Sequence, residues 1–337
     1  MPNLGALALV FLSSTLASGG LIWLLQPLWR HYALAKPNRR SSHKEPTPQG
    51  GGIAVIAVTI VVTALAAVFI AEMYGATPHI ALVLAAAVLL AIVGAIDDVY
   101  VIEVVPRFFL QTLAVIIVVA ALPPEARIFQ VLPWWIERLL LLFGGIWFVN
   151  LVNFMDGIDW MTVAEVVPVT AGLAIFGLMG ALPLPATIVA LALCGATLGF
   201  APFNRPVARL FLGDVGSLPI GLLLTWLLIQ LAARGHLAAA LLLPLYYTAD
   251  ATVTLLRRLV SGERITQAHR DHYYQRALDR GSEVGKIVAA VAGTNVVLMG
   301  LAALTLVTVS IWVHVALAAA GSGIVAALLW VFNRGRR

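Results

Sequence analysis

The stretch NLVNFMDGID, residues 150–159, ends an apolar run that begins near Trp134. Its ten residues include two Asn and two Asp but no Lys or Arg, so the carboxylates of Asp156 and Asp159 have no cationic neighbour in the local sequence. Uncompensated carboxylates near a membrane surface usually bind a metal ion or a cationic ligand. The alternative is a polar helix end that caps and hydrates the exit from the membrane.

The spacing of these polar residues favours a shared face. Asn150 and Asn153 are three positions apart, which places them on one side of a helix, and the two Asp repeat that spacing. Gly157, between the two Asp, is expected to permit a tight backbone turn. The stretch therefore predicts amide and carboxylate groups presented together.

The composition predicts an all-α polytopic membrane protein and excludes a soluble globule. Of 337 residues, 61% are hydrophobic and 11% are charged, and the mean hydropathy is +0.97. The net charge of +5 is more typical of cytoplasmic loops and attraction to anionic lipid than of a nucleic-acid partner. A single cysteine, Cys194, excludes an intrachain disulfide. Because Arg30 follows the first apolar run, we expect no cleavable signal peptide.

Apolar segments divide the whole chain, and we interpret residues 1–337 as a single integral-membrane domain with about 11 transmembrane helices. The segments lie near residues 4–28, 51–72, 79–96, 106–122, 134–152, 160–180, 184–202, 215–233, 236–259, 285–308 and 310–333.

The charged residues predict an orientation. If the N-terminus is outside, eighteen of the 21 Lys and Arg fall in inside loops, and only Arg127, Arg138 and Arg234 lie outside. We therefore expect a periplasmic N-terminus and a cytoplasmic C-terminus. Seven of the eight Asp fall on the same inside face or at its helix ends, and Asp250 lies within the ninth segment.

Two predicted loops on this face come before residues 150–159 in the sequence. Residues 36–52 combine Pro and Gly with basic residues and His43, which suits the covering of an anionic ligand or, alternatively, contact with lipid. Asp97 and Asp98 follow an apolar helix directly, and adjacent carboxylates repel each other unless a cation neutralises them. The pair suits metal binding or proton abstraction. A solvated helix terminus is disfavoured because the helix dipole opposes an acidic C-terminus.

Residues 204–217 form a further candidate loop, which opens with Asn204. Asp214 lies between two glycines just before an apolar helix, so it is either the helix cap or a metal ligand. Phe211 is either a membrane-interface aromatic or a platform on which a nucleobase stacks.

The last loop, residues 269–276, carries His269, Arg270 and His272, with the two histidines on one face if the loop is helical. A zinc site is disfavoured because the lone cysteine lies far away in an apolar run. A phosphate cradle is the functional interpretation, and a solvated basic loop is the alternative. Asp250, inside a spanning segment, is a functional-site hypothesis by default, although it is expected to reach only the inner interface.

Together these loops resemble the polyprenyl-phosphate N-acetylhexosamine-1-phosphate transferases of glycosyltransferase family 4. That family includes the phospho-N-acetylmuramoyl-pentapeptide translocase and the enzymes that start O-antigen and related glycans. The matching pieces, in chain order, are Pro46–Thr47–Pro48 with its glycines, Asp97–Asp98 with Arg107 and Gln111, residues 150–159, residues 204–217 and residues 269–275.

The resemblance implies a helical bundle in the bacterial inner membrane with a cytosolic active site. It implies transfer of a sugar 1-phosphate from a UDP-N-acetyl sugar to undecaprenyl phosphate, which yields undecaprenyl-diphospho-sugar and UMP. It also implies a requirement for Mg²⁺, with Mn²⁺ as an alternative, and a homodimer. The loop chemistry agrees, since two anionic reactants need a metal ion and basic groups to meet.

The resemblance also implies residue roles. Asp214 corresponds to the Mg²⁺ ligand, with Asp98 as a second metal candidate, and Asp97 and Asp98 correspond to the pair that deprotonates or positions the lipid phosphate. By the same resemblance, nucleotide and metal positions are Asn150, Asn153, Asp156 and Asp159. The two Asp among them are assigned as catalytic. Substrate binding is assigned to His43, Asn204, Phe211, His269, Arg270 and His272.

Two departures concern the donor sugar. Val101 stands where the peptidoglycan branch has Lys, and Tyr274 and Gln275 stand where many members have further histidines. The loop is more similar to the O-antigen-initiating branch that handles 6-deoxy-N-acetylhexosamines. Two other classes compete with an enzyme. A transporter would place its polar site near the midplane, and a scaffold would not need aspartates gathered on one face.

Overall fold

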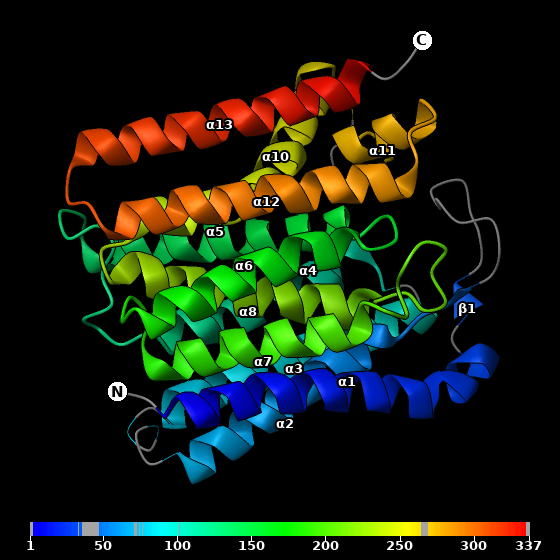
Figure 1. The fold of residues 1–337 in the computed structure, drawn as a ribbon, viewed down its shortest axis with the longest axis horizontal. Coiled ribbons are helices and arrows are strands. Elements are labelled where there is room, and N and C mark those ends of the chain that lie inside the picture. Colours follow the sequence, from blue (N-terminus) through cyan, green and yellow to red (C-terminus); the bar gives the residue numbers. More distant parts are fainter. Residues whose placement is uncertain are drawn as a thin grey trace.

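The computed structural model describes residues 3–32, 34–35, 47–70, 73, 75, 77–100, 102–263 and 269–334. Most of these residues are helical (Figure 1). The helices are α1 (Leu4–Tyr32), α2 (Gly51–Phe69), α3 (Thr77–Tyr100), α4 (Val104–Ala120), α5 (Trp134–Met155), α6 (Met161–Leu178), α7 (Leu184–Phe200), α8 (Asp214–Ala233), α9 (Leu237–Leu242), α10 (Leu245–Val260), α11 (Tyr273–Asp279), α12 (Val284–Leu306) and α13 (Ile311–Arg334).

The predicted fold class is confirmed. Among the described residues, eight helices are long and apolar enough to cross a membrane, and α4 and α7 are shorter apolar helices. Ten of the eleven predicted segments each correspond to one helix. The segment 236–259 is instead broken into α9 and α10. Pro244 stands at the break, where it lacks the N–H that a continuous helix would need.

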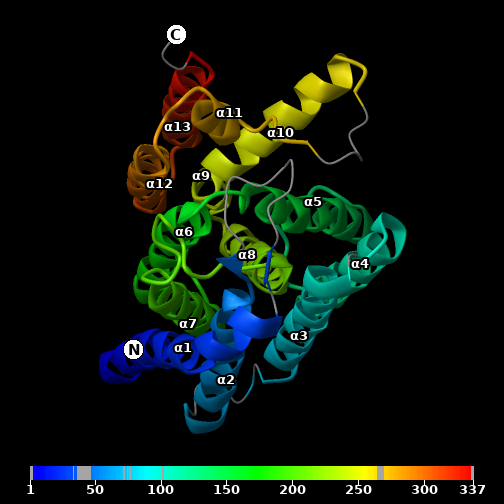
Figure 2. The same cartoon turned by 90° about the vertical axis from the view of Figure 1, so that its right-hand side faces the viewer.

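Helix α8 occupies the centre of the bundle, as Figure 2 shows. It is almost entirely buried and packs against α3 and α5. Its sequence is apolar on every side, which is what a helix surrounded by other helices requires. Gly94 of α3 permits the closest approach, because a Cβ there would lie 2.2 Å from the backbone oxygen of Asp214. The start of α8 is therefore held directly against the last turns of α3.

The two ends of the bundle differ in character (Figure 1). The polar ends of α3 and α5, the starts of α4 and α8, and the short helix α11 are at one end, where the C-terminus also lies. The N-terminus lies at the opposite end. This arrangement matches the expected gathering of aspartates at one membrane face, although the side that faces the cytoplasm stays a prediction.

Two short strands join distant loops at the polar end. β1 (Leu34–Ala35) pairs antiparallel with β2 (Thr47–Pro48), and Gln49 forms a parallel bridge with Phe211. The Phe211 N–H donates to the Pro48 carbonyl at 2.8 Å, and the Phe211 carbonyl accepts from the Gly51 N–H at 2.9 Å. The first predicted loop and the loop before α8 therefore lie side by side.

Candidate functional site

The guanidinium of Arg107, in the first turn of α4, connects three polar side chains from three other helices. Its Nη1 lies 2.5 Å from Asp97 Oδ2 and 3.2 Å from Asp214 Oδ2. Its Nη2 donates to Asn153 Oδ1 at 2.9 Å. One cation thus joins the ends of α3 and α5 to the start of α8. We call Asp97, Arg107, Asn153 and Asp214 the Arg107 cluster.

Asn153 fixes the orientation of the Asp214 carboxylate. Its Nδ2 donates to Asp214 Oδ1 at 2.8 Å and lies 2.9 Å from Ser217 Oγ. Both oxygens of Asp214 are therefore held, one by an amide and one by a guanidinium. In sequence no Lys or Arg is closer to Asp214 than Arg209. In the folded chain Arg107 reaches Asp214 from a different helix.

Asp98 caps helix α8 from the neighbouring helix α3. Its Oδ1 accepts the N–H of Asp214 at 2.9 Å, and its Oδ2 accepts the N–H of Val215 at 3.1 Å. The N-cap position itself is Gly213, at φ 78°, where a Cβ would lie 2.5 Å from Asp98 Oδ2. The alternative in which Asp214 is the helix cap is therefore wrong, since Asp98 supplies the cap and the Asp214 side chain contacts Arg107 and Asn153 instead.

Asp156 and Asp159 lie in the loop after α5. The Thr162 hydroxyl donates to Asp156 Oδ1, and Asp159 Oδ2 accepts the N–H of Ala208 at 2.9 Å. Burial, with the nearby charges of Asp98 and Asp159, raises the pKa of Asp156 to about 6. Within the described residues Asp156 forms no ion pair, as the local sequence predicted.

Two predicted substrate residues have other contacts in the structure. Asn150 Nδ2 donates to the Ile146 carbonyl of its own helix at 2.8 Å. Asn204 is buried, accepts the Trp160 N–H at 2.8 Å and donates to the Leu210 carbonyl at 2.9 Å. Asn204 therefore holds two loops together, and among the described contacts Asn150 does not reach the Arg107 cluster.

The first loop is described only in part. Gln49 Nε2 donates to the Asp98 carbonyl at 2.7 Å, which places this loop beside the aspartate pair. Phe211 is half-buried next to this loop. Its position is compatible with both predicted roles, a membrane-interface aromatic and a platform for a nucleobase. His43, Pro46 and Val101 lie outside the described residues.

The histidine loop is organised by Asp250, which is fully buried. Asp250 Oδ1 lies 3.3 Å from His272 Nδ1 and accepts the Tyr273 N–H at 3.0 Å, while Oδ2 accepts the Tyr274 N–H at 3.4 Å. The carboxylate therefore caps α11 and orients His272. The contacts with α11 explain why Asp250 lies within a spanning segment, and no proton relay is needed to account for it.

The other residues of this loop lie close by but not on a helix, because α11 begins only at Tyr273. The rings of His269 and His272 are 5.0 Å apart. Burial, together with nearby His272, lowers the pKa of His269 to about 4, so its imidazole is neutral at pH 7. Arg270 pairs with Asp279 at 2.9 Å. The permanent positive charge of the loop therefore comes from arginine.

The backbone turns at Gly157, whose N–H donates to the Met155 carbonyl at 2.9 Å, and the glycine also has a role that was not predicted. Its φ is not positive, but a Cβ there would lie 2.1 Å from the Tyr274 hydroxyl oxygen. That hydroxyl donates to the Phe154 carbonyl at 3.3 Å. Glycine is required for space, because α11 sits directly against the loop that carries Asp156 and Asp159.

The donor set fits a magnesium ion. Within the described part of the chain, no three carboxylate, imidazole or thiol groups form a complete metal cage. Mg²⁺ does not need one, since it is usually held by one or two carboxylates together with substrate phosphates and water. Asp98, Asp156 and Asp214 offer oxygen atoms only, and Asp156 is partly buried and has no ion pair among the described residues. A hard cation bound here would neutralise carboxylate charge that the protein itself leaves uncompensated.

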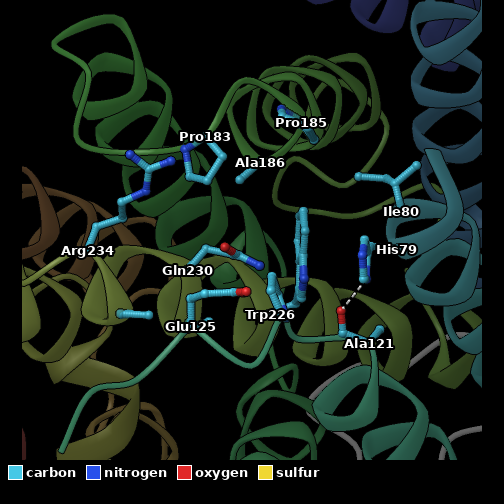
Figure 3. A pocket seen from close by; sticks show the side chains of 13 residues that line it. His79, Ile80, Ala121, Glu125, Pro183, Pro185, Ala186, Trp226, Gln230 and Arg234 are labelled. Atoms are coloured by element: carbon cyan, nitrogen blue, oxygen red, sulfur yellow. Dashed lines mark hydrogen bonds between the residues drawn. The ribbon is translucent and has the colours of Figure 1, made fainter. Parts of the chain in front are cut away.

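A cavity of about 430 Å³ lies away from these residues, at the end of the bundle where α3 begins and α8 ends. Figure 3 shows Trp226 and Gln230 of α8 and Arg234, which follows α8, on one side and His79 of α3 on the other. His79 Nδ1 lies 2.8 Å from the Ala121 carbonyl oxygen. No predicted site residue lines this cavity.

Sequence reasoning missed the central position of Arg107, which it had matched to the family without assigning a role. It also missed Thr162 and Ser217, which contact Asp156 and Asn153. The one available signal was a single basic residue in the first turn of an otherwise apolar helix. Neutral hydroxyls one turn into apolar helices gave no signal at all.

Comparison with known proteins identifies relatives. The model of glycosyl transferase family 4 matches residues 80–232. A decaprenyl-phosphate N-acetylglucosaminephosphotransferase of Mycobacterium leprae is 28% identical over 84% of this chain and 79% of its own length. A probable undecaprenyl-phosphate N-acetylglucosaminyl 1-phosphate transferase of Bacillus subtilis is 25% identical over 74% and 70%. A phospho-N-acetylmuramoyl-pentapeptide-transferase of Streptococcus pneumoniae is 26% identical over 68% and 74%.

Proposed function

We propose that the chain is a member of glycosyl transferase family 4, whose model matches residues 80–232, and that it transfers a sugar 1-phosphate from a UDP-N-acetyl sugar to undecaprenyl phosphate and releases UMP. Its relatives are named as transferases that act on polyprenyl phosphates, which supports the general reaction. The O-antigen-like histidine loop supports a donor of the N-acetylhexosamine or 6-deoxy-N-acetylhexosamine class, and a place at the first membrane step of a cell-envelope glycan.

The observation that carries this proposal is the Arg107 cluster. Phosphoryl transfer depends mainly on positioning and on stabilisation of charge on the phosphate oxygens. Arg107 offers a planar guanidinium at the point where Asp97 and Asp214 converge, and such a group suits phosphate recognition. Asn153 and the Asp98 cap fix Asp214 before any substrate arrives, so the cost of ordering this carboxylate is already met in the folded protein.

Mg²⁺ is the proposed cofactor, with Mn²⁺ as an alternative. Asp214 would hold it, with Asp98 or Asp156 as the neighbouring carboxylate. The bound ion would supply neutralisation of the diphosphate charge. The chain's own part is to exclude water, to orient Asp214 through Asn153 and to place Asp97 beside Arg107, where a carboxylate can accept a proton from the lipid phosphate or position it.

The histidine loop is proposed to bind the diphosphate and sugar. The contact of α11 with the 154–157 loop brings it to the Asp156 side of the site. Since the His269 imidazole is neutral in the free protein, arriving phosphate would raise its pKa and favour the protonated form. Phe211 is proposed to stack on uracil.

The proposed setting is the bacterial inner membrane, with the site facing the cytoplasm and the N-terminus in the periplasm. A homodimer is proposed as the assembly. The relatives' names support a polyprenyl phosphate acceptor. The undecaprenyl length is proposed.

The test is UMP release by purified protein with undecaprenyl phosphate, Mg²⁺ and a panel of UDP-sugars. UDP-N-acetylglucosamine and a UDP-6-deoxy-N-acetylhexosamine are the two informative donors. We expect UMP only when donor, lipid phosphate and metal are all present. Uptake of a UDP-sugar by proteoliposomes without UMP formation would instead support a transporter and refute the proposal.

A further inference from the structure

A second groove lies between α4 and α5, at the end of these helices opposite Arg107. Figure 2 shows the two helices next to each other. The groove has a volume of about 350 Å³, and its walls include Ile116, Val119, Leu139 and Leu142. Thirteen positions of α4 separate Arg107 from Ala120 at the groove, which corresponds to roughly 20 Å along the helix. The groove is therefore separate from the proposed catalytic site.

One charged side chain lines this apolar groove. Arg138 is only 7% exposed, so its guanidinium is withdrawn from water. Nη2 donates to the Pro123 carbonyl at 3.0 Å and to the Ala126 carbonyl at 3.4 Å. The Nε and Nη1 atoms find no acceptor among the described residues. Two donors of a permanently charged group are thus left without a partner beside an apolar slot.

The neighbouring carboxylate, Glu137, makes no ion pair with Arg138 among the described residues, although its charge acts on both Arg127 and Arg138. Glu137 Oε2 lies 2.5 Å from Arg127 Nε, and Glu137 Oε1 accepts the Ile128 N–H at 2.6 Å. Arg138 has instead the ring of Trp134, with its guanidinium carbon 5.5 Å from the ring centroid. Arg127 and Arg138 thus share the charge of one carboxylate. A buried guanidinium that lacks an ion pair is costly, so this arrangement indicates a countercharge supplied from outside the chain.

We propose that this groove binds one anionic phospholipid, whose phosphate contacts Arg138 and whose acyl chain fills the slot between α4 and α5. A guanidinium fork matches phosphate oxygens, and basic pockets between membrane helices bind lipid headgroups. Trp134 and Trp135 are more than half exposed beside it, which is typical of side chains at the headgroup level. The lipid belongs to the leaflet opposite the Arg107 cluster, so it is not the acceptor substrate.

The experiment measures lipid binding by the purified full-length chain. Protein stripped of lipid in mild detergent receives phosphatidylglycerol, phosphatidylcholine, diacylglycerol or inorganic phosphate. Native mass spectrometry counts retained lipids, and thermal unfolding measures stabilisation. Arg138→Gln removes the charge. Ala120→Phe fills the groove without touching the charge and serves if Arg138→Gln fails to fold. Arg234→Gln is the matched control, because it removes an exposed cation at the same end of the bundle.

For wild type and Arg234→Gln we expect retention of one phosphatidylglycerol and a rise in melting temperature that diacylglycerol does not reproduce. In Arg138→Gln the apparent affinity should fall about tenfold or more, as loss of charge-assisted hydrogen bonds implies, and Ala120→Phe should lose the retained lipid. Equal binding by wild type and both groove variants would overturn the proposal. So would equal stabilisation by inorganic phosphate, which would indicate a free-anion site, or by diacylglycerol, which would indicate an apolar slot alone.

Discussion

At the scale of single residues, the strongest prediction concerns Asp214. Asn in its place keeps the shape and the contact with Asn153 but removes the charge that a hard cation and Arg107 require. Because Asp98 supplies the cap of α8, the helix should form normally. We expect Asp214→Asn to lower UMP release by about 100-fold or more, the loss seen when a single electrostatic group is removed from an active site.

The measurement is UMP release across a Mg²⁺ titration, with the melting temperature as the control for folding. Near-normal activity with an unchanged metal dependence would remove Asp214 from the site. A collapse of the melting temperature would show a structural role instead.

A second prediction at this scale is a dependence of stability on pH. Burial raises the pKa of Asp156 to about 6, above its ordinary value of 3.8. Between these values the folded protein keeps a proton that the unfolded chain has lost, so the stability contributed is present below 3.8 and is lost as pH rises through about 6. Asp156→Asn should lose stability less steeply across this window.

Thermal unfolding of both proteins between about pH 4 and pH 7, with a chelator present to keep metal away, measures the difference. Thr162→Val is a useful control, since it removes the hydroxyl that donates to Asp156 and should raise the carboxyl pKa further. Parallel curves for wild type and Asp156→Asn would contradict the assignment.

At the scale of elements, two helices begin on carboxylates that belong to other helices. Asp98 of α3 receives the start of α8, and Asp250 of α10 receives the start of α11. The sequence presented both residues as candidates for chemistry, because an acidic residue at a helix end or in a membrane span looks functional in isolation. The sequence could not predict that the free N–H groups at the starts of α8 and α11 point toward these two carboxylates.

The cap from Asp98 gives a third prediction. Asp98→Ala removes the acceptor of two N–H bonds at the start of the most buried helix, so it should destabilise the protein by about 1–2 kcal/mol, as loss of an N-cap does. Asp98→Asn keeps an oxygen acceptor and should cost less. Unfolding midpoints rank the three proteins. If Ala and Asn variants unfold together with wild type, the interhelical cap contributes nothing.

The contact between α11 and the loop after α5 gives a fourth prediction. Gly157→Ala would place a methyl 2.1 Å from the Tyr274 hydroxyl oxygen, so α11 must shift away from the Asp156 loop. We expect a fall in both melting temperature and activity. Tyr274→Phe removes the obstructing oxygen, although it also loses a hydrogen bond. A double-mutant cycle should therefore show that the two changes together cost less than their sum. Strict additivity would mean that the two elements do not touch.

At the scale of the whole molecule, periodic apolar runs predicted nearly every helix, because each span must bury or present to lipid about the same length of apolar surface. The break at Pro244 was the exception, since a proline inside an apolar run is tolerated in membrane helices and does not by itself announce an end. The face that carries the site was also predicted from the one-sided aspartates. The pairing of Arg107 with Asn153 and Asp214 was not, because partners 46 and 107 positions apart meet only when α4 and α5 pack beside α8.

The last prediction is the orientation. Figure 1 places the N-terminus at one end of the bundle and α11 at the other, and the basic residues predict that the α11 end is cytoplasmic. Cys194 is buried, so cysteines introduced elsewhere report with little background. Asn3→Cys lies at one end, and Glu283→Cys lies at the other, between α11 and α12. A membrane-impermeant maleimide added to intact cells should label Asn3→Cys, whereas Glu283→Cys should react only after permeabilisation. Labelling of Glu283→Cys in intact cells would put the site outside, away from a cytosolic nucleotide donor, and would refute both the orientation and the proposed reaction.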